Sequence, residues 1–126
     1  MKYRAIQRRN PTDPTAPKKW YVTSVKTGTV TQRSISNDIV ESSSLTHGDV
    51  SHAIESLLNA IPRYLLLGNS VKLGVLGTFR LSVSSPGVDA PEDVNANIIS
   101  RVKVIYTPSP ELRKQIQIKH VKFEKA

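Results

Sequence analysis

The stretch VKLGVLGTFRLSV, residues 71–83, indicates how the chain folds. Apolar side chains alternate with polar ones on both sides of its central glycine, Gly77. Alternation with a period of two is typical of a half-buried strand, and a glycine between two such runs favours a turn. The stretch therefore predicts two antiparallel strands around a glycine turn. A third alternating run, RVKVIY at residues 101–106, predicts one more strand of the same sheet.

Two helical segments precede this sheet. Residues 32–42 have apolar side chains at helical spacing and predict a short helix. The stronger signal begins at Thr46, which together with Asp49 forms a variant of the capping box. The apolar residues that follow have helical spacing as far as Leu67, and Gly68-Asn69 then suits a left-handed C-cap.

The two ends of the chain add further elements. Residues 2–9 have an imperfect period of two and predict an edge strand, which is expected to pair with a second strand at residues 19–26. In that second strand Trp20 and Tyr21 are expected to pack in a core, although they could also stack on bases. Near the other end, Ser109-Pro110 is a typical start for a short C-terminal helix. The basic end that follows is either a tail or a further strand.

The positive charge of the chain lies at its two ends. Among 126 residues there are 18 Lys and Arg against 10 Asp and Glu, so the formal net charge is +8. Residues 1–33 contain eight basic side chains and one acid, residues 34–100 three and seven, and residues 101–126 seven and two. If folding brings the two ends together, they form a patch for a polyanion; the alternative is a solvated surface without a partner.

Length and composition exclude several classes of protein. A chain of 126 residues is expected to form one domain, and without cysteine it has no disulfide, thiolate metal site or cysteine nucleophile. No apolar run approaches the roughly 20 residues of a membrane span, and no signal peptide is evident, so we expect a soluble intracellular protein. His47 and His52 are poorly spaced for a shared metal, and no catalytic or nucleotide-binding motif occurs. We therefore expect no enzyme, no cofactor and no small-molecule substrate.

The order of these elements resembles the bacterial HU and integration host factor family. Residues 71–79, VKLGVLGTF, are similar to the V-x-L-x-G-F-G-T-F turn of that family, with Val75 and Leu76 replacing its first glycine and phenylalanine. Residues 106–114, YTPSPELRK, are similar to its aromatic residue followed by Ser/Pro-Gly-Lys-x-Leu-Lys. The resemblance covers residues 31–118. It leaves residues 1–30 as an N-terminal β extension and residues 119–126 as a basic tail.

The resemblance implies an HU-like α+β fold and a nucleoid-associated, cytoplasmic homodimer that binds and condenses double-stranded DNA without sequence preference. Helices would form the base of the dimer, sheets a basic saddle, and two arms would embrace the minor groove. The alternation of the strands puts four cations on the outward side, and two more lie in the N-terminal extension. The candidate DNA-binding residues are Lys72, Arg80, Arg101, Lys103, Lys18 and Lys19.

A wide apolar surface on the long helix predicts the seam of a dimer, since excess apolar area on one element is typical of a subunit interface. A larger monomeric core is the alternative. The candidate interface residues are Leu57, Leu58, Ile61, Leu65 and Phe79.

The expected arm departs from the family pattern. Residues 86–95 contain three acids and no Lys or Arg, whereas the family arm is basic and carries a motif near R-N-P-x-T-G. Phosphates repel carboxylates, so we expect either weaker DNA bending or the use of the extra basic segments instead. Candidates for that substitute surface are Lys18, Lys19, Arg8 and Arg9, and the alternative is a solvated loop. A second hypothesis is therefore an HU-derived structural module whose acidic arm docks on a protein partner. A third, RNA binding, is not separated from DNA binding by the sequence.

Overall fold

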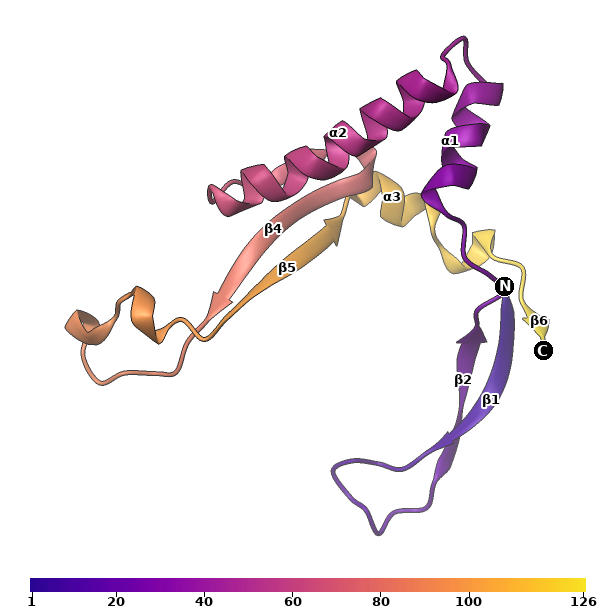
Figure 1. Cartoon of the computed structure of the whole chain (residues 1–126). Coiled ribbons are helices and arrows are strands. Elements are labelled where there is room, and N and C mark those ends of the chain that lie inside the picture. The colour runs from indigo at the N-terminus through magenta and orange to yellow at the C-terminus, as the bar shows by residue number, and fades with distance from the viewer. The chain divides into compact units, whose positions relative to one another are not determined.

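The structure is a computed structural model that describes residues 1–126, and its chain forms two compact units. The terminal unit comprises Met1–Gln32 together with Ile116–Ala126, and the central unit comprises Arg33–Gln115 (Figure 1). The expected meeting of the two basic ends occurs only in part, because the terminal unit holds three of the seven cations of residues 101–126 and the central unit holds the other four. The last residues are part of the terminal unit rather than a separate tail.

Two helices open the central unit, α1 at Gln32–Glu41 and α2 at His47–Leu66. The predicted capping box is confirmed, because Thr46 Oγ1 accepts from the amide of Asp49 at 3.1 Å and the Asp49 carboxylate accepts from the amide of Thr46 at 3.4 Å. At the other end Gly68 has a φ of 89°, and its amide and the next one donate to carbonyls in the last turn. The predicted left-handed cap is thus confirmed.

The central sheet has three antiparallel strands in the order β3-β4-β5. They are β3 at Val71–Leu73, β4 at Gly77–Ser84 and β5 at Arg101–Pro108. A turn of 3-10 helix at Gly74–Leu76 joins the first two, so the turn precedes Gly77, at which the sequence predicted it, and Gly77 is the first residue of β4. The short helix α3, Pro110–Gln115, follows β5 at its predicted start.

Gly77 allows β4 and β5 to approach each other closely. Its φ is 127°, and a Cβ at this position would lie 2.2 Å from the carbonyl oxygen of Thr107 and 3.0 Å from Cα of Pro108. No side chain fits so close to backbone atoms, and the positive φ disfavours any residue other than glycine. The glycine of the turn motif is therefore required by a backbone contact.

Two hydroxyl groups tie the turn to the end of β5. The Tyr106 hydroxyl donates to the carbonyl of Leu76 at 2.6 Å, and the Ser109 hydroxyl donates to the carbonyl of Val75. Ser109 Oγ also accepts from the amide of Leu112 at 3.1 Å, so it caps α3 as predicted. One serine thus starts the helix and anchors it to the turn.

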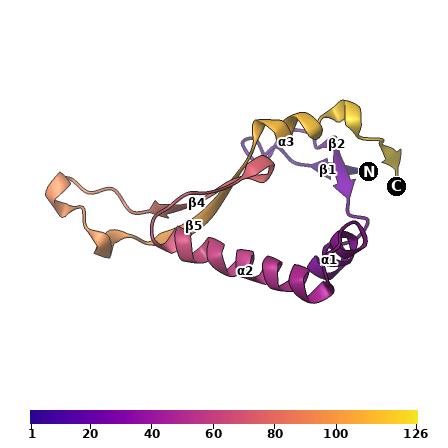
Figure 2. The same ribbon diagram turned by 90° about the horizontal axis from the view of Figure 1, so that it is seen from above.

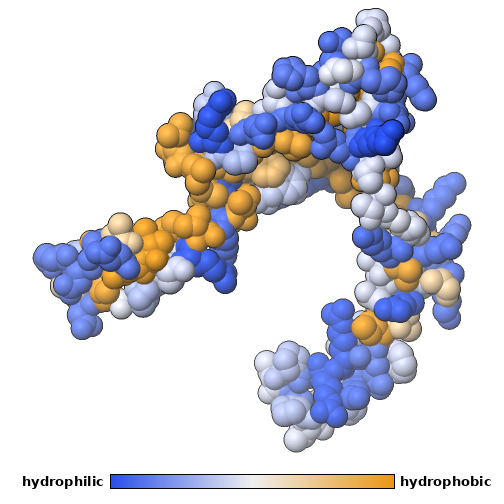
Figure 3. Space-filling view, in the orientation of Figure 1, coloured by the Kyte–Doolittle hydropathy of each residue, from blue (hydrophilic) through white to orange (hydrophobic).

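The hydrophobic core of a single chain is small. Val50 and Leu65, 3% and 5% exposed, are the hydrophobic side chains that are buried. Phe79 and Tyr106 stack with ring centroids 5.0 Å apart. Farther along the sheet the apolar face has no cover, and Figure 3 shows hydrophobic residues exposed along β4 and β5.

An arm extends from the central sheet between β4 and β5. In Figures 1 and 2 this segment projects beyond α2. The amide and the hydroxyl of Ser100 both donate to the carbonyl of Ser84, at 2.9 and 3.1 Å, and close the arm at the end of the strands. The tip contains two short turns of 3-10 helix, Pro91–Asp93 and Ala96–Ile98.

The terminal unit contains a second sheet, in the order β2-β1-β6. Strands β1, Lys2–Arg8, and β2, Lys19–Val25, form the predicted antiparallel hairpin. Strand β6, Glu124–Lys125, pairs in parallel with the start of β1 after a 3-10 turn at Ile118–His120. The prediction that β1 is an edge strand is therefore wrong: β1 is central, because a two-residue strand from the far end of the chain pairs with it.

The expectation that Trp20 and Tyr21 pack in a core is also wrong. Their side chains are 67% and 49% exposed. The terminal unit consists of one small sheet, which has no second sheet or α-helix of its own to cover these rings. Strand-forming residue types thus predicted the secondary structure correctly but not the burial.

Candidate nucleic-acid interface

The register of the central sheet gathers its cations on one face. Arg80 lies opposite Ile105, Ser82 opposite Lys103 and Ser84 opposite Arg101. Paired residues point to the same side of a sheet, and alternate residues of one strand share a face. The sequence-predicted cations on this face are all exposed: Lys72, Arg80, Arg101 and Lys103.

The opposite face of the same sheet is apolar. Phe79 pairs with Tyr106, and the next two pairs along the arm join Leu81 to Val104 and Val83 to Val102. The two valines of β5 are 55% and 60% exposed, so this face has no cover along the arm. The sheet thus presents a basic side and an apolar side, as its alternating sequence predicted.

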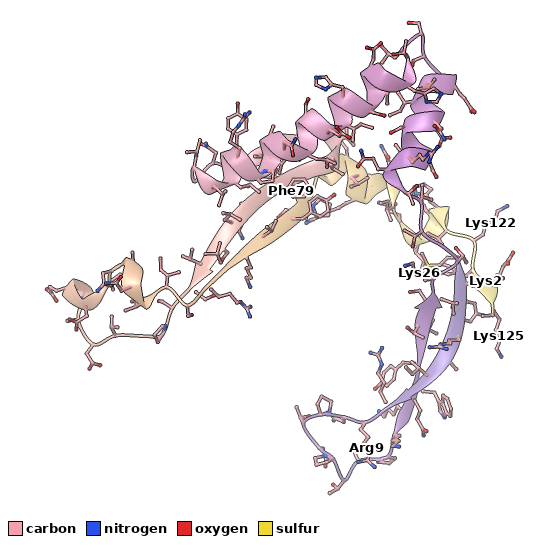
Figure 4. The ribbon with its side chains drawn as sticks, in the orientation of Figure 1. Lys2, Arg9, Lys26, Phe79, Lys122 and Lys125 are labelled. Carbon is pink, nitrogen blue, oxygen red and sulfur yellow. The ribbon has the colours of Figure 1, made fainter.

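The candidate interface residues on α2 differ in burial. Leu57 and Leu58 are 45% and 50% exposed, Ile61 is half-buried, and Leu65 is buried within its own chain. Phe79 is half-buried on the part of β4 next to α2 (Figure 4). Leu66 and Leu67, which follow Leu65, are also exposed. Most of the apolar surface that the sequence predicted is therefore open to solvent in one chain.

The tip of the arm is acidic and exposed. Asp89, Glu92 and Asp93 all lie on its surface, and no Lys or Arg occurs between Ser84 and Arg101. The cations of the central sheet thus end where the strands end.

The terminal hairpin has a basic face of its own. In its register Arg8 lies opposite Lys19 and Ile6 opposite Tyr21, so these four side chains share a face with Lys2 and Arg4. Lys18 is exposed just before β2. The sequence-based candidates for a basic surface are Lys18, Lys19, Arg8 and Arg9, and they do not include Arg4. The alternation of Arg4 with Ala5 and Gln7 places it on the same face as Arg8.

The end of this hairpin is hollowed. Arg8, Arg9, Lys19 and Tyr21 line a concavity of about 430 Å³ together with prolines of the connecting loop. Three cations therefore surround one depression at the tip.

The loop that closes the hairpin is ordered by local hydrogen bonds. Asn10 Oδ1 accepts from the amide and hydroxyl of Thr12, at 3.0 and 2.7 Å. Asp13 Oδ1 accepts in the same way from Thr15, at 3.1 and 2.6 Å. These bonds, first the one from the Thr15 hydroxyl, lower the pKa of Asp13 below its usual value because they stabilise the ionised carboxylate.

The net charge of the chain resides entirely in the terminal unit. This unit contains ten Lys and Arg against two Asp and Glu, whereas the central unit contains eight of each. The central unit therefore has no net charge. Its sheet cations lie on one face of the strands, however, whereas three of its acids lie at the tip of the arm.

No group of three or more His, Asp or Glu side chains is arranged to hold a metal ion. No helix is long and apolar enough to cross a membrane.

Two helices beside a three-stranded antiparallel sheet with a projecting arm define an α+β protein of the HU-like class. A family model described as "HU domain fused to wHTH, Ig, or Glycine-rich motif" (HU-HIG) matches residues 1–125. The chain belongs to this family, and the sequence-based recognition of an HU-like protein is confirmed.

A solved structure has a similar fold. It is a "putative bacterial DNA binding protein" from Bacteroides vulgatus ATCC 8482, with a TM-score of 0.59 and 19% sequence identity. The match covers 98% of the present chain and 47% of that protein, so the chain spans about half its length. No curated protein matches the chain.

Proposed function

We propose that the chain is an architectural protein of the nucleoid that binds double-stranded DNA largely without sequence preference. The observation that carries the proposal is the register of β3, β4 and β5, which collects four exposed cations on the face opposite the apolar one. Contacts of Lys and Arg with phosphate oxygens position a protein on a duplex without reading its bases. Membership of the HU-HIG family and the description of the Bacteroides protein as DNA-binding support the same proposal.

The proposed DNA-binding form is a homodimer. A single chain buries only Val50 and Leu65 among its hydrophobic side chains and leaves Leu57 and Leu58 about half exposed on α2. A second copy packed against α2 would remove this apolar surface from water, which is the main driving force for association. The oligomeric state and the DNA contact are thus two parts of one proposal.

The acidic arm favours a second candidate function. Its three exposed carboxylates repel phosphates, and they suit a basic surface on a protein partner. In this case the chain is an HU-derived interaction module with weak or absent DNA bending. The two candidates differ in whether the basic face of the central sheet is needed for binding.

Fluorescence anisotropy with two labelled duplexes of unrelated sequence, titrated between about 50 and 200 mM salt, tests the first candidate. We expect similar affinities for both duplexes and a steep fall with salt, at a slope of about −0.9 for each phosphate neutralised. A variant with Lys72→Ala, Arg80→Ala, Arg101→Ala and Lys103→Ala is expected to have a shallower slope. An affinity that stays flat as salt rises would exclude a phosphate contact.

A further inference from the structure

The terminal β-unit has the electrostatic character of a polyanion-binding surface, although it contains neither the turn motif nor the helix caps of the central unit. It carries ten cations and two acids, and the central unit is neutral. Glu124 pairs beside Lys2 at the far end of β1, and Asp13, which lies in the loop at the tip of the hairpin, is not among the residues that line the concavity there. The Oδ1 atom of Asp13 accepts its hydrogen bonds from Thr15 rather than from a cation.

Within this unit the cations are not spread evenly. Arg8 and Lys19 face each other across the two strands, and with Arg9 they line the concavity at the end of the hairpin. Figure 4 shows Arg9 at this end, whereas Lys2, Lys26, Lys122 and Lys125 lie near the opposite end of the unit. In Figure 3 the surface of the tip is predominantly hydrophilic.

Three like charges around one depression repel each other when no anion is present. An anion in the concavity would relieve that repulsion, and guanidinium groups bind phosphate oxygens through two parallel hydrogen bonds. Arg8 and Arg9 provide two such groups, and Lys19 adds a third cation. The chemistry of the site therefore fits phosphate oxygens.

Prolines and local hydrogen bonds restrict the loop beside the concavity. Pro11 and Pro17 line the site and restrict the backbone, and the hydrogen bonds of Asn10 and Asp13 close two successive turns between them. A preorganised site loses less conformational entropy on binding than a mobile loop does.

We propose that the tip of the terminal hairpin, formed by Arg8, Arg9 and Lys19, is a second contact for the phosphate backbone of DNA, separate from the basic face of the central sheet. The inference rests on the proposed DNA-binding function and adds a surface to it. On this view the family's central sheet supplies one phosphate contact, and the extension supplies another that compensates for the acidic arm.

A pair of matched variants of the whole chain tests the inference. The tip variant contains Arg8→Ala, Arg9→Ala and Lys19→Ala, and the control variant contains Lys26→Ala, Lys122→Ala and Lys125→Ala. Both remove three cations from the terminal unit, so they change its net charge equally. Circular dichroism and thermal unfolding establish that both variants retain the fold.

Binding of a labelled duplex is then measured at several salt concentrations. We expect the tip variant to bind about tenfold or more weakly and to have a slope shallower by about two to three, since each lost phosphate contact removes about 0.9 from the slope. The control variant is expected to lose less than about threefold, because charges away from the contact act only through the screened long-range field.

The outcomes separate this inference from the proposed function. Equal effects of the tip and control variants, or no effect of the tip variant on DNA that the unmodified protein binds, would overturn the second contact and leave the central sheet as the binding surface. The central-sheet variant is the one with Lys72, Arg80, Arg101 and Lys103 all replaced by alanine. If the tip variant loses binding and the central-sheet variant does not, the contact at the hairpin tip is supported and the contact at the central sheet is overturned. If the unmodified protein binds no duplex at low salt, both are wrong.

Discussion

The central and terminal units differ in what their sequences encode. The central unit contains the turn motif, both helix caps of α2 and the strand pairs of the HU-like fold, yet its eight cations are balanced by eight acids. The terminal unit contains none of those motifs but holds the whole net charge. The difference teaches that the part of a chain with the most recognisable sequence motifs need not be the part that dominates its long-range electrostatics.

The largest expected effect is on stability, at Gly77 of the central unit, where the backbones of β4 and β5 approach each other closely. Gly77→Ala places a Cβ 2.2 Å from the carbonyl oxygen of Thr107 and should lower the free energy of unfolding by at least about 2 kcal/mol. Gly28→Ala, in the terminal unit, has no atom within 4 Å of its Cβ and should be nearly neutral. Urea denaturation followed by circular dichroism measures both, and equal stabilities would contradict the contact at Gly77.

The next effect concerns self-association through α2. Leu58→Asp introduces a charge into the proposed interface and should weaken the dimer by tenfold or more, because an unpaired carboxylate would be buried there. The matched change Val30→Asp, at an exposed residue of the terminal unit, should leave the dimer intact. Sedimentation equilibrium distinguishes them. A protein that is monomeric at micromolar concentration before any substitution would refute the dimer.

Removing a threonine hydroxyl that forms a hydrogen bond has a smaller effect on stability, and the effect is expected to be larger at the helix cap of the central unit than in the loop of the terminal unit. Thr46→Ala removes the acceptor for the Asp49 amide and should cost about 1 kcal/mol of stability. Thr12→Ala, in the loop of the terminal hairpin, removes only an exposed hydroxyl contact with Asn10 and should cost a few tenths of that. Thermal unfolding of the two variants compares them; a larger loss for Thr12→Ala would reverse the expected order.

The acidic arm is expected to have a weaker influence, on DNA binding. Asp89→Asn, Glu92→Gln and Asp93→Asn remove three exposed negative charges and should strengthen binding by a few-fold at low salt, as repulsion from phosphate is lost. Glu55→Gln, on α2, serves as a single-charge control. If the arm variant binds DNA unchanged but loses a protein partner, the interaction-module hypothesis is favoured.

The smallest effect is local to the terminal hairpin. Thr15→Ala removes the hydroxyl bond that lowers the pKa of Asp13, so that pKa should rise towards its usual value. Because the folded-state pKa is lowered, the stabilisation is present above the unfolded pKa and fades as pH falls through the folded value. An NMR titration of the Asp13 carboxyl measures the shift, and an unchanged pKa would show that the Thr15 bond does not cause it.

Much of the central unit was predictable because its signals are local. The capping box at Thr46, the left-handed cap at Gly68 and the period of two around Gly77 each depend on residues close in sequence, and each is confirmed. The shared face of Lys72, Arg80, Arg101 and Lys103 followed from the same periodicity once the strands paired in register.

The errors lie where a distant segment determines the environment. The β1 strand is central because Glu124 and Lys125 pair with it, and two residues carry too little pattern to predict a strand. Trp20 and Tyr21 are exposed because their sheet lacks a covering layer, which their own sequence does not reveal. The sequence indicated Arg8, Arg9 and Lys19 as candidates for a basic surface, but it did not predict the concavity that they line, because the hairpin register brings them together across a ten-residue connection.

The central claim, that each unit contacts DNA phosphates separately, is tested most directly by a double-mutant cycle on the salt dependence of binding. The slope of log Kobs against log salt is measured for the unmodified protein, the central-sheet variant, the tip variant and their combination. Independent contacts predict that the two reductions in slope add in the combined variant. A combined variant no shallower than one of the single variants, or a flat slope for the unmodified protein, would contradict the claim.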